Sequence, residues 1–186
     1  MTDVLCFGTL AQRSPTSAAT ICRFLEALPV TALRVFDVNL RQSYFNRDVI
    51  QRSLRRCDIV KLNHNELPHV AQLLNQKFVD EISSARELLD RYQLKVVCIT
   101  RGENGSLLVD STTTSTHPGF RIKVADTIGA GDAFTACLAH YYVNGCGLDE
   151  INSAANRFAG WVASQHGGTP SLNGRSIEEL LSGNQL

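Results

Sequence analysis

The residues best suited to chemistry lie in one segment, DTIGAGD at residues 126–132, directly ahead of a predicted helix. Gly129 and Gly131 can adopt positive φ, or let another group approach the backbone closely. The helix behind them leaves its first N–H groups without helical partners and presents the positive end of its dipole. This arrangement predicts an anion site, and Asp132 places a carboxylate beside it. An anion site next to a base is the minimum needed to move a phosphoryl group onto a hydroxyl.

The same segment has a structural alternative, a glycine turn followed by a helix with an acidic first turn. Aspartate is common in first turns because it complements the helix dipole. A bare G-x-G-D string fits both interpretations, since short motifs often match by chance. The full seven-residue string ahead of a helix is more specific and favours the phosphoryl site.

Strands and helices alternate through the first hundred residues. The expected strands are 4–7, 33–38, 59–62 and 95–100. The expected helices between them are 15–28, 47–56, one that Asn65 could cap, and 79–92. This alternation predicts parallel strands with helices on both faces.

The pattern changes after residue 100. Two short strands, 105–110 and 113–120, are expected to pair antiparallel at the sheet edge. Helices are expected at 130–144, at 149–166 and from Ser176, where Ser176 and Glu179 form a capping box. No linker or repeat divides the chain, so we expect one α/β domain over residues 1–186.

Composition narrows the class of protein. The 186 residues carry 18 basic and 18 acidic side chains, so bulk charge favours neither a nucleic-acid nor a membrane surface. An apolar content of 44% is enough for a sizeable core. No apolar run is long enough to span a bilayer, and we expect no signal peptide. The six cysteines lack a C-x-x-C pair, so we expect free, mostly buried thiols in a reducing cytoplasm and no structural zinc site.

Polar clusters follow the carboxyl ends of the predicted parallel strands, where ligands bind in open sheets. They are DVNLR at 37–41, NHNE at 63–66 and TRGENG at 100–105. Together with residues 126–132, they are expected to converge on one rim. Each has a structural alternative: a turn or cap for Asp37, a helix cap for Asn63 and Glu66, a solvated surface position for Arg41.

These motifs resemble the ribokinase, or PfkB, family of carbohydrate kinases. Residues 126–132 match the family signature D-T-x-G-A-G-D, and NHNE at 63–66 matches its N-x-x-E motif. Residues 100–105 resemble the loop that holds the nucleotide, and residues 167–170 resemble the G-x-x-x-P-type loop near the C-terminus. The resemblance runs along the whole chain. It implies a ribokinase-like three-layer α/β/α fold with a mainly parallel sheet and an antiparallel edge.

Two further strings, FGTL at 7–10 and DVNLR at 37–41, look most like the fructokinase and 2-keto-3-deoxygluconate kinase branches of the family. The resemblance therefore implies ATP-dependent phosphorylation of a sugar hydroxyl, with Mg²⁺ required and K⁺ as a candidate second cation. Asp132 would be the catalytic base. The N–H groups of Gly129, Ala130 and Gly131 would receive the charge of the transferring phosphoryl group. Glu66 would act on Mg²⁺ through water.

The resemblance also implies ligand contacts residue by residue. The nucleotide contacts would be Asn63, Glu66, Thr100, Arg101, Gly102, Gly105, Asn156 and Ala159. The substrate contacts would be Asp37, Asn39, Arg41 and Asp132. The monovalent-cation ligands would be Asp126, Ile128, Gly167 and Ser171. The implied partner is a small-molecule sugar, with no nucleic acid or membrane, and the full-length form would be a cytoplasmic homodimer.

The chain is expected to depart from the family pattern at its N-terminus. Family members carry a sugar-contacting Gly-Gly region and a small β-sheet lid ahead of the segment that begins here. A lid excludes water and completes the site, so we expect weak or no sugar phosphorylation by this chain alone. We also expect an exposed apolar sheet edge. Two alternatives stay open, a nucleoside or vitamin-precursor kinase of the same fold and a remnant that binds nucleotide without turnover.

Overall fold

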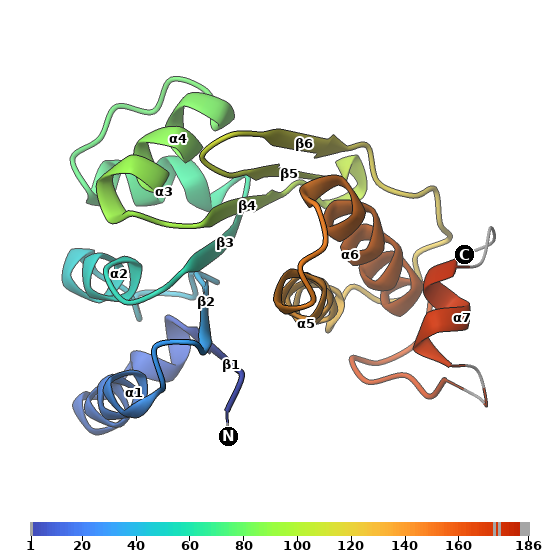
Figure 1. Ribbon diagram of the computed structural model, residues 1–186, viewed down its shortest axis with the longest axis horizontal. Helices are drawn as coiled ribbons and strands as arrows, with labels where there is room; N and C mark the ends of the chain where they lie inside the picture. The colour runs from blue at the N-terminus through green and yellow to red at the C-terminus, as the bar shows by residue number, and fades with distance from the viewer. Residues whose placement is uncertain (1, 173, 175, 183–186) are drawn as a thin grey trace. The chain divides into compact units, whose positions relative to one another are not determined.

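The computed structural model describes residues 2–172, 174 and 176–182, which form an α/β fold (Figure 1). The sheet has the order β1-β2-β3-β4-β5-β6. Its parallel strands are β1 Val4–Gly8, β2 Leu33–Asp37, β3 Ile59–Asn63 and β4 Val96–Thr100. The antiparallel edge is formed by β5 Ser106–Val109 and β6 Thr114–His117. The predicted fold class, with a mainly parallel sheet and an antiparallel edge, is confirmed.

The helices that connect the parallel strands begin at side-chain caps. The helices are α1 Pro15–Ala27, α2 Arg47–Leu54 and α4 Glu81–Tyr92. Ser14 Oγ accepts the N–H of Ser17 at 3.2 Å, and Pro15 fills the first helical position, where a missing N–H costs nothing. Asn46 and Asp80 cap the other two helices in the same way, each through a 2.9 Å bond from a backbone N–H.

The cap of α3 Glu66–Leu73 differs from the prediction. Asn65 makes no side-chain cap, because its backbone is already helical, with φ −80° and ψ −30°. A capping residue needs an extended backbone to turn its side chain back onto the helix. Asn63 supplies the acceptor instead, and its Oδ1 receives the N–H groups of Asn65 and Glu66, both at 2.9 Å.

Contacts within the chain define two compact units. The first contains Met1–Thr100 and Leu108–Thr114, and α1 to α4 lie in it beside the parallel strands (Figure 1). Its core includes Phe36, Ile59, Leu62 and Ile99, all with no exposed surface. The strands β3 and β4 are buried on both faces, as expected for central parallel strands covered by helices.

The second unit contains Arg101–Leu107 and Ser115–Leu186. Its helices are α5 Ala130–Val143, α6 Leu148–Ala163 and α7 Ile177–Ser182, and α5 packs along α6 (Figure 1). The predicted capping box of α7 is confirmed, because Ser176 N donates to Glu179 Oε2 at 2.9 Å and Glu179 N donates to Ser176 Oγ at 3.0 Å.

All six cysteines are free thiols. Cys57, Cys98 and Cys137 are buried, whereas Cys6 is exposed on β1. The expectation of buried thiols therefore holds for half of them. Burial raises the pKa of the Cys137 thiol to about 12, so this thiol is protonated at neutral pH. Among the helices of the described residues, none has the length and apolar character needed to cross a bilayer.

Candidate active site

One carboxylate joins two of the polar clusters in the first unit. Glu66 is only 9% exposed, and its Oε2 accepts the N–H of Asn63 at 2.8 Å. Its Oε1 accepts the N–H of Leu40, also at 2.8 Å. Glu66 therefore holds the loop after β2 against the loop after β3. This is the rim on which the sequence places ligand contacts.

Thr100 lies at the same rim, directly beside Asn63. The two residues are opposite each other in the register of β3 and β4, and Thr100 O accepts the N–H of His64 at 2.9 Å. Parallel pairing thus brings the ends of two predicted nucleotide clusters together.

The predicted substrate residue Asp37 takes part in a part-buried ion pair. Its Oδ2 lies 2.9 Å from Lys61 Nζ, and the two side chains are 16% and 10% exposed. Asp37 and Lys61 are register partners on β2 and β3, which explains why they meet. Sequence reasoning missed Lys61. The signal was a lysine in the middle of an apolar strand, because a buried charge requires a partner.

The rest of the loop at 37–41 is shaped by its backbone. Asn39 has φ 42°, in the left-handed region that asparagine tolerates better than most residues. Arg41 is exposed, which is compatible both with a contact to the substrate and with a solvated surface position. The hydrogen bond from the Leu40 N–H to Glu66 fixes the turn between Asn39 and Arg41.

In the second unit, Gly129 is the conformationally special residue of the segment 126–132. It precedes α5 with φ 79°, and a Cβ at this position would collide with Gly168 O and lie 2.8 Å from Gly168 Cα. Only glycine satisfies both restrictions. Gly131 lies inside α5 and does not use positive φ. Only Gly129 therefore needs to be glycine for its backbone conformation, whereas Gly131 has an ordinary helical backbone. The sequence did not predict the close contact between Gly129 and Gly168.

Asp126 ties the segment to the end of α6. Its Oδ1 accepts the N–H of Ile128 at 3.0 Å and its Oδ2 accepts the N–H of Gly167 at 3.3 Å. The N–H groups of Ala125 and Asp126 both donate to Ala163 O, at 2.9 and 3.2 Å. Three of the predicted monovalent-cation ligands are thus brought together.

The start of α5 presents Asp132 in its first turn. Asp132 is exposed, and within the described part of the chain its carboxylate accepts no hydrogen bond and forms no ion pair. Ala130 N donates to Thr127 O at 3.4 Å, near the long limit for a hydrogen bond. The helix start thus combines the weakly bonded N–H of Ala130 with an exposed carboxylate.

The loop at 101–105 closes on itself. Arg101 N donates to Gly105 O at 2.7 Å, and Gly105 N donates to Gly102 O at 3.2 Å. Gly102 and Gly105 have φ 60° and 77°. A Cβ on Gly105 would overlap His117 O. The glycines therefore make a compact loop, a form suited to holding a phosphate or ribose close to the backbone.

Asn156 and Ala159, predicted on the adenine side, both lie on α6. Asn156 is buried in a polar network, where its Nδ2 lies 2.7 Å from Ser106 Oγ and 2.9 Å from Asn152 Oδ1. Its amide donors are used within the protein. Ala159 is half-buried. The candidate residues fall into two groups. Those up to Thr100 belong to the first unit, and those from Arg101 onward belong to the second.

The side chains fit an indirect role in Mg²⁺ binding. Each Glu66 oxygen accepts one backbone N–H and keeps capacity for another donor, such as a metal-bound water. Mg²⁺ characteristically retains waters and is held by few carboxylates together with substrate phosphates. Across the described ranges, no three His, Cys, Asp or Glu side chains form a group that could hold a metal ion directly.

Comparisons with known proteins agree with these motifs. The chain is 32% identical to the deoxyribokinase of Salmonella typhimurium over 112 residues, which is 60% of this chain and 36% of that protein. The aminoimidazole riboside kinase of Salmonella enterica superposes with a TM-score of 0.79 at 22% identity, covering 98% of this chain and 63% of that one. The ATP-bound fructokinase of Xylella fastidiosa gives a TM-score of 0.80 at 17% identity, covering 96% and 61%.

The two structural likenesses show a fold shared with ribokinase-type kinases. The chain spans less than half the length of the curated relatives it matches first. The family model described as pfkB family carbohydrate kinase matches residues 3–174, nearly the whole chain. This protein therefore belongs to the pfkB family of carbohydrate kinases.

Proposed function

We propose that this chain provides the nucleotide and phosphoryl-transfer part of an ATP-dependent kinase that acts on a hydroxyl of fructose or a related sugar or sugar acid. One observation carries the proposal. The segment 126–132 opens α5 with a left-handed Gly129, and the carboxylate of Asp132 is exposed in the first turn. Membership of a carbohydrate kinase family supports the same reaction class.

In the proposed reaction, Asp132 accepts the proton of the sugar hydroxyl. The hydroxyl oxygen forms a bond to the γ-phosphorus of ATP while the bond to the bridging oxygen breaks and ADP leaves. The N–H groups of Gly129, Ala130 and Gly131 stabilise the charge on the transferring group. Phosphoryl transfer depends mainly on such positioning and charge stabilisation.

Asn63 and Glu66 would organise the phosphates, together with Thr100, Arg101, Gly102 and Gly105. Bound Mg²⁺ would neutralise phosphate charge. Glu66 keeps the loops after β2 and β3 in one arrangement through its bonds to Leu40 and Asn63, so it would hold metal-bound water from a fixed position. Asp126, Ile128, Gly167 and Ser171 would supply the oxygen atoms of a K⁺ site.

Asn39 and Arg41 would contact the sugar, with Asp37 acting from its ion pair with Lys61. The DVNLR string at 37–41 favours a sugar or sugar acid over a nucleoside. A nucleoside or vitamin-precursor kinase is the alternative reaction. A non-catalytic nucleotide-binding protein is the alternative without turnover.

Replacement of the base tests the mechanism. We expect Asp132→Asn, made in a form that carries the expected lid region, to leave ATP affinity within about twofold and to lower turnover by about 10²–10⁴, the usual contribution of a general base. ATP binding is measured by calorimetry. Turnover is measured with fructose, 2-keto-3-deoxygluconate, ribose and adenosine as acceptors. Asp90→Asn makes the same charge change on the exposed face of α4 and should alter neither quantity.

The outcomes separate the alternatives. Turnover that survives Asp132→Asn would show that Asp132 is not the base. Turnover with adenosine alone would favour the nucleoside kinase. ATP binding without turnover of any acceptor, in a form that carries the expected lid region, would favour the non-catalytic protein.

A further inference from the structure

The first unit contains a second candidate binding site, far along the strands from Glu66. A cavity of about 410 Å³ lies at the amino ends of β2 and β3. Its wall is formed by the last residues of α1 and α4, the chain that follows α2, and the start of β2. The volume is in the range of small-molecule sites. None of its residues belongs to the phosphoryl-transfer motifs.

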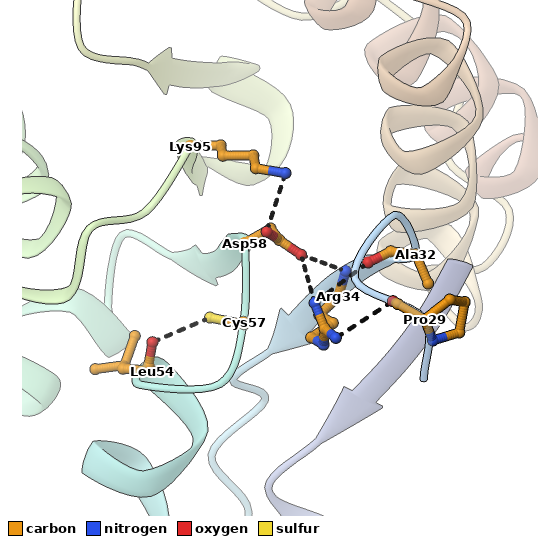
Figure 2. Close-up of polar contacts among 7 residues, drawn as sticks. All are labelled: Pro29, Ala32, Arg34, Leu54, Cys57, Asp58 and Lys95. Atoms are coloured by element: carbon orange, nitrogen blue, oxygen red, sulfur yellow. Dashed lines mark hydrogen bonds and ion pairs between the residues drawn. The ribbon is translucent and has the colours of Figure 1, made fainter. Parts of the chain in front are cut away.

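Asp58 anchors one side of this cavity. Its Oδ2 accepts the backbone N–H of Arg34 at 2.8 Å and lies 3.9 Å from Arg34 Nη1. Its Oδ1 lies 3.1 Å from Lys95 Nζ, so the carboxylate is flanked by two cations (Figure 2). The charge of Asp58 is therefore compensated within the protein. Its role is to hold Arg34 in place.

Among the residues described, the guanidinium of Arg34 makes only long contacts, in contrast to its backbone N–H. Nη1 lies 3.5 Å from Ala32 O, and Nη2 lies 3.4 Å from Pro29 O (Figure 2). Charge-assisted bonds from arginine to an oxyanion are much shorter, about 2.7–2.9 Å. A guanidinium has five N–H donors. Arg34 is thus positioned in the wall without a strong partner for its side chain.

Two more arginines reach the same cavity. Arg56 Nη2 lies 3.5 Å from Glu26 Oε1, a long and mostly exposed contact. Arg55 is exposed and makes no side-chain hydrogen bond or ion pair within the residues described. Both follow α2, where cations also offset the negative end of the helix dipole. That explanation does not extend to Arg34, which lies in a strand.

The wall therefore carries three guanidinium groups against two carboxylates, and each carboxylate faces a cation of its own. The buried side chains of Leu25 and Tyr92 add an apolar surface. We propose that this cavity binds a small metabolite through a phosphoryl or carboxylate oxyanion held by Arg34, Arg55 and Arg56. The site is separate from the phosphoryl-transfer motifs and does not depend on the proposed kinase reaction.

Binding of simple oxyanions tests this site. Inorganic phosphate and citrate serve as the two probes, titrated into the full chain by calorimetry at constant ionic strength. We expect Arg55→Gln to raise the Kd of the bound probe about tenfold, through loss of one charge-assisted contact. Arg23→Gln removes the same charge from the exposed face of α1, outside the cavity, and should leave the Kd unchanged.

A second variant should act in the opposite direction. Glu26→Gln frees Arg56 from its carboxylate and should lower the Kd severalfold, whereas Glu87→Gln on the exposed face of α4 should not. Loss of phosphate binding alone in Arg55→Gln would identify a phosphoryl ligand, and loss of citrate binding alone a carboxylate ligand. The proposal is overturned if neither probe binds at millimolar concentration. Equal effects of Arg55→Gln and Arg23→Gln would overturn it too.

Discussion

Gly129 is the residue whose replacement is most restricted in the segment 126–132. Its φ of 79° and its approach to Gly168 are separate obstacles to a side chain. We expect Gly129→Ala to lower the free energy of unfolding by about 1–3 kcal/mol, the usual cost of such strain, and to weaken ATP binding. Urea unfolding and calorimetry measure the two effects.

Gly145→Ala is the matched control for this substitution. Gly145 has nearly the same φ, 77°, but a Cβ there would meet nothing within 4 Å. Gly145→Ala should lower the free energy of unfolding only by the cost of placing alanine at positive φ, and it should leave ATP binding intact. Equal losses in the two variants would show that the contact with Gly168 contributes nothing.

Lys61 is expected to matter more for stability than any exposed lysine of the chain. Lys61→Met removes the cation from this part-buried pair, and loss of one partner of such a pair costs up to about 3–5 kcal/mol. Lys95→Met also removes an ion pair, but the Lys95 side chain is 53% exposed, so a change below about 1 kcal/mol is expected. Thermal and urea unfolding provide the measurement. A small effect at Lys61 would mean that water reaches Asp37 freely.

Residue types at strand ends were predictable, but their partners were not. The sequence places Asn63 and Glu66 after β3, and it also allows them a capping role. In the structure, Asn63 does cap α3, and Glu66 binds Leu40, a backbone contact 26 residues away in sequence. Such contacts depend on which strands become neighbours and in which register. Local sequence does not encode that information.

At the scale of elements, helix starts were predictable wherever capping and backbone geometry agree. Ser14 with Pro15 and Ser176 with Glu179 are local signals, and both are confirmed. The cap at Asn65 failed, because two asparagines lie close together and the register of β3 decides which one keeps an extended backbone. The antiparallel edge was predictable because turn residues separate β5 from β6.

The helix α6 is joined to this edge by buried side chains. Asn152 has no exposed surface, and its Nδ2 donates to Ser115 O at 3.1 Å while its Oδ1 accepts from Ser106 Oγ at 2.5 Å. We expect Asn152→Ala to destabilise the protein by about 1–3 kcal/mol, because it leaves buried polar groups unsatisfied.

Asn144→Ala is the corresponding control. Asn144 donates to His140 O at 2.8 Å on the exposed end of α5, where water can replace the bond. Its loss should cost much less. Comparable free energies of unfolding for the two variants would contradict a buried network that stabilises α6.

At the scale of the whole molecule, β1 is an outer strand of the sheet that the described residues form. It contains no proline and no charged residue, and Cys6 at its centre is exposed. Edges of this kind pair with other chains. We expect concentration-dependent self-association, measured by sedimentation velocity, and expect Leu5→Lys to reduce it.

Leu10→Lys places the same charge just outside β1, at a residue that is 38% exposed, and should have a smaller effect. A monomer at all concentrations would show that the β1 edge does not associate. An equal reduction by both variants would assign the association to a surface other than this edge.

The order of the sheet has a consequence for synthesis. Each strand from β2 to β6 lies beside the strand that precedes it among the described strands, so spatial order and chain order coincide. The ribosome releases the strands in that same order. Every new strand can add to a neighbour that has already emerged, without waiting for a partner from the far end of the chain. Translation and sheet growth therefore proceed in the same direction, which shortens the time that an unpaired strand is exposed to other chains.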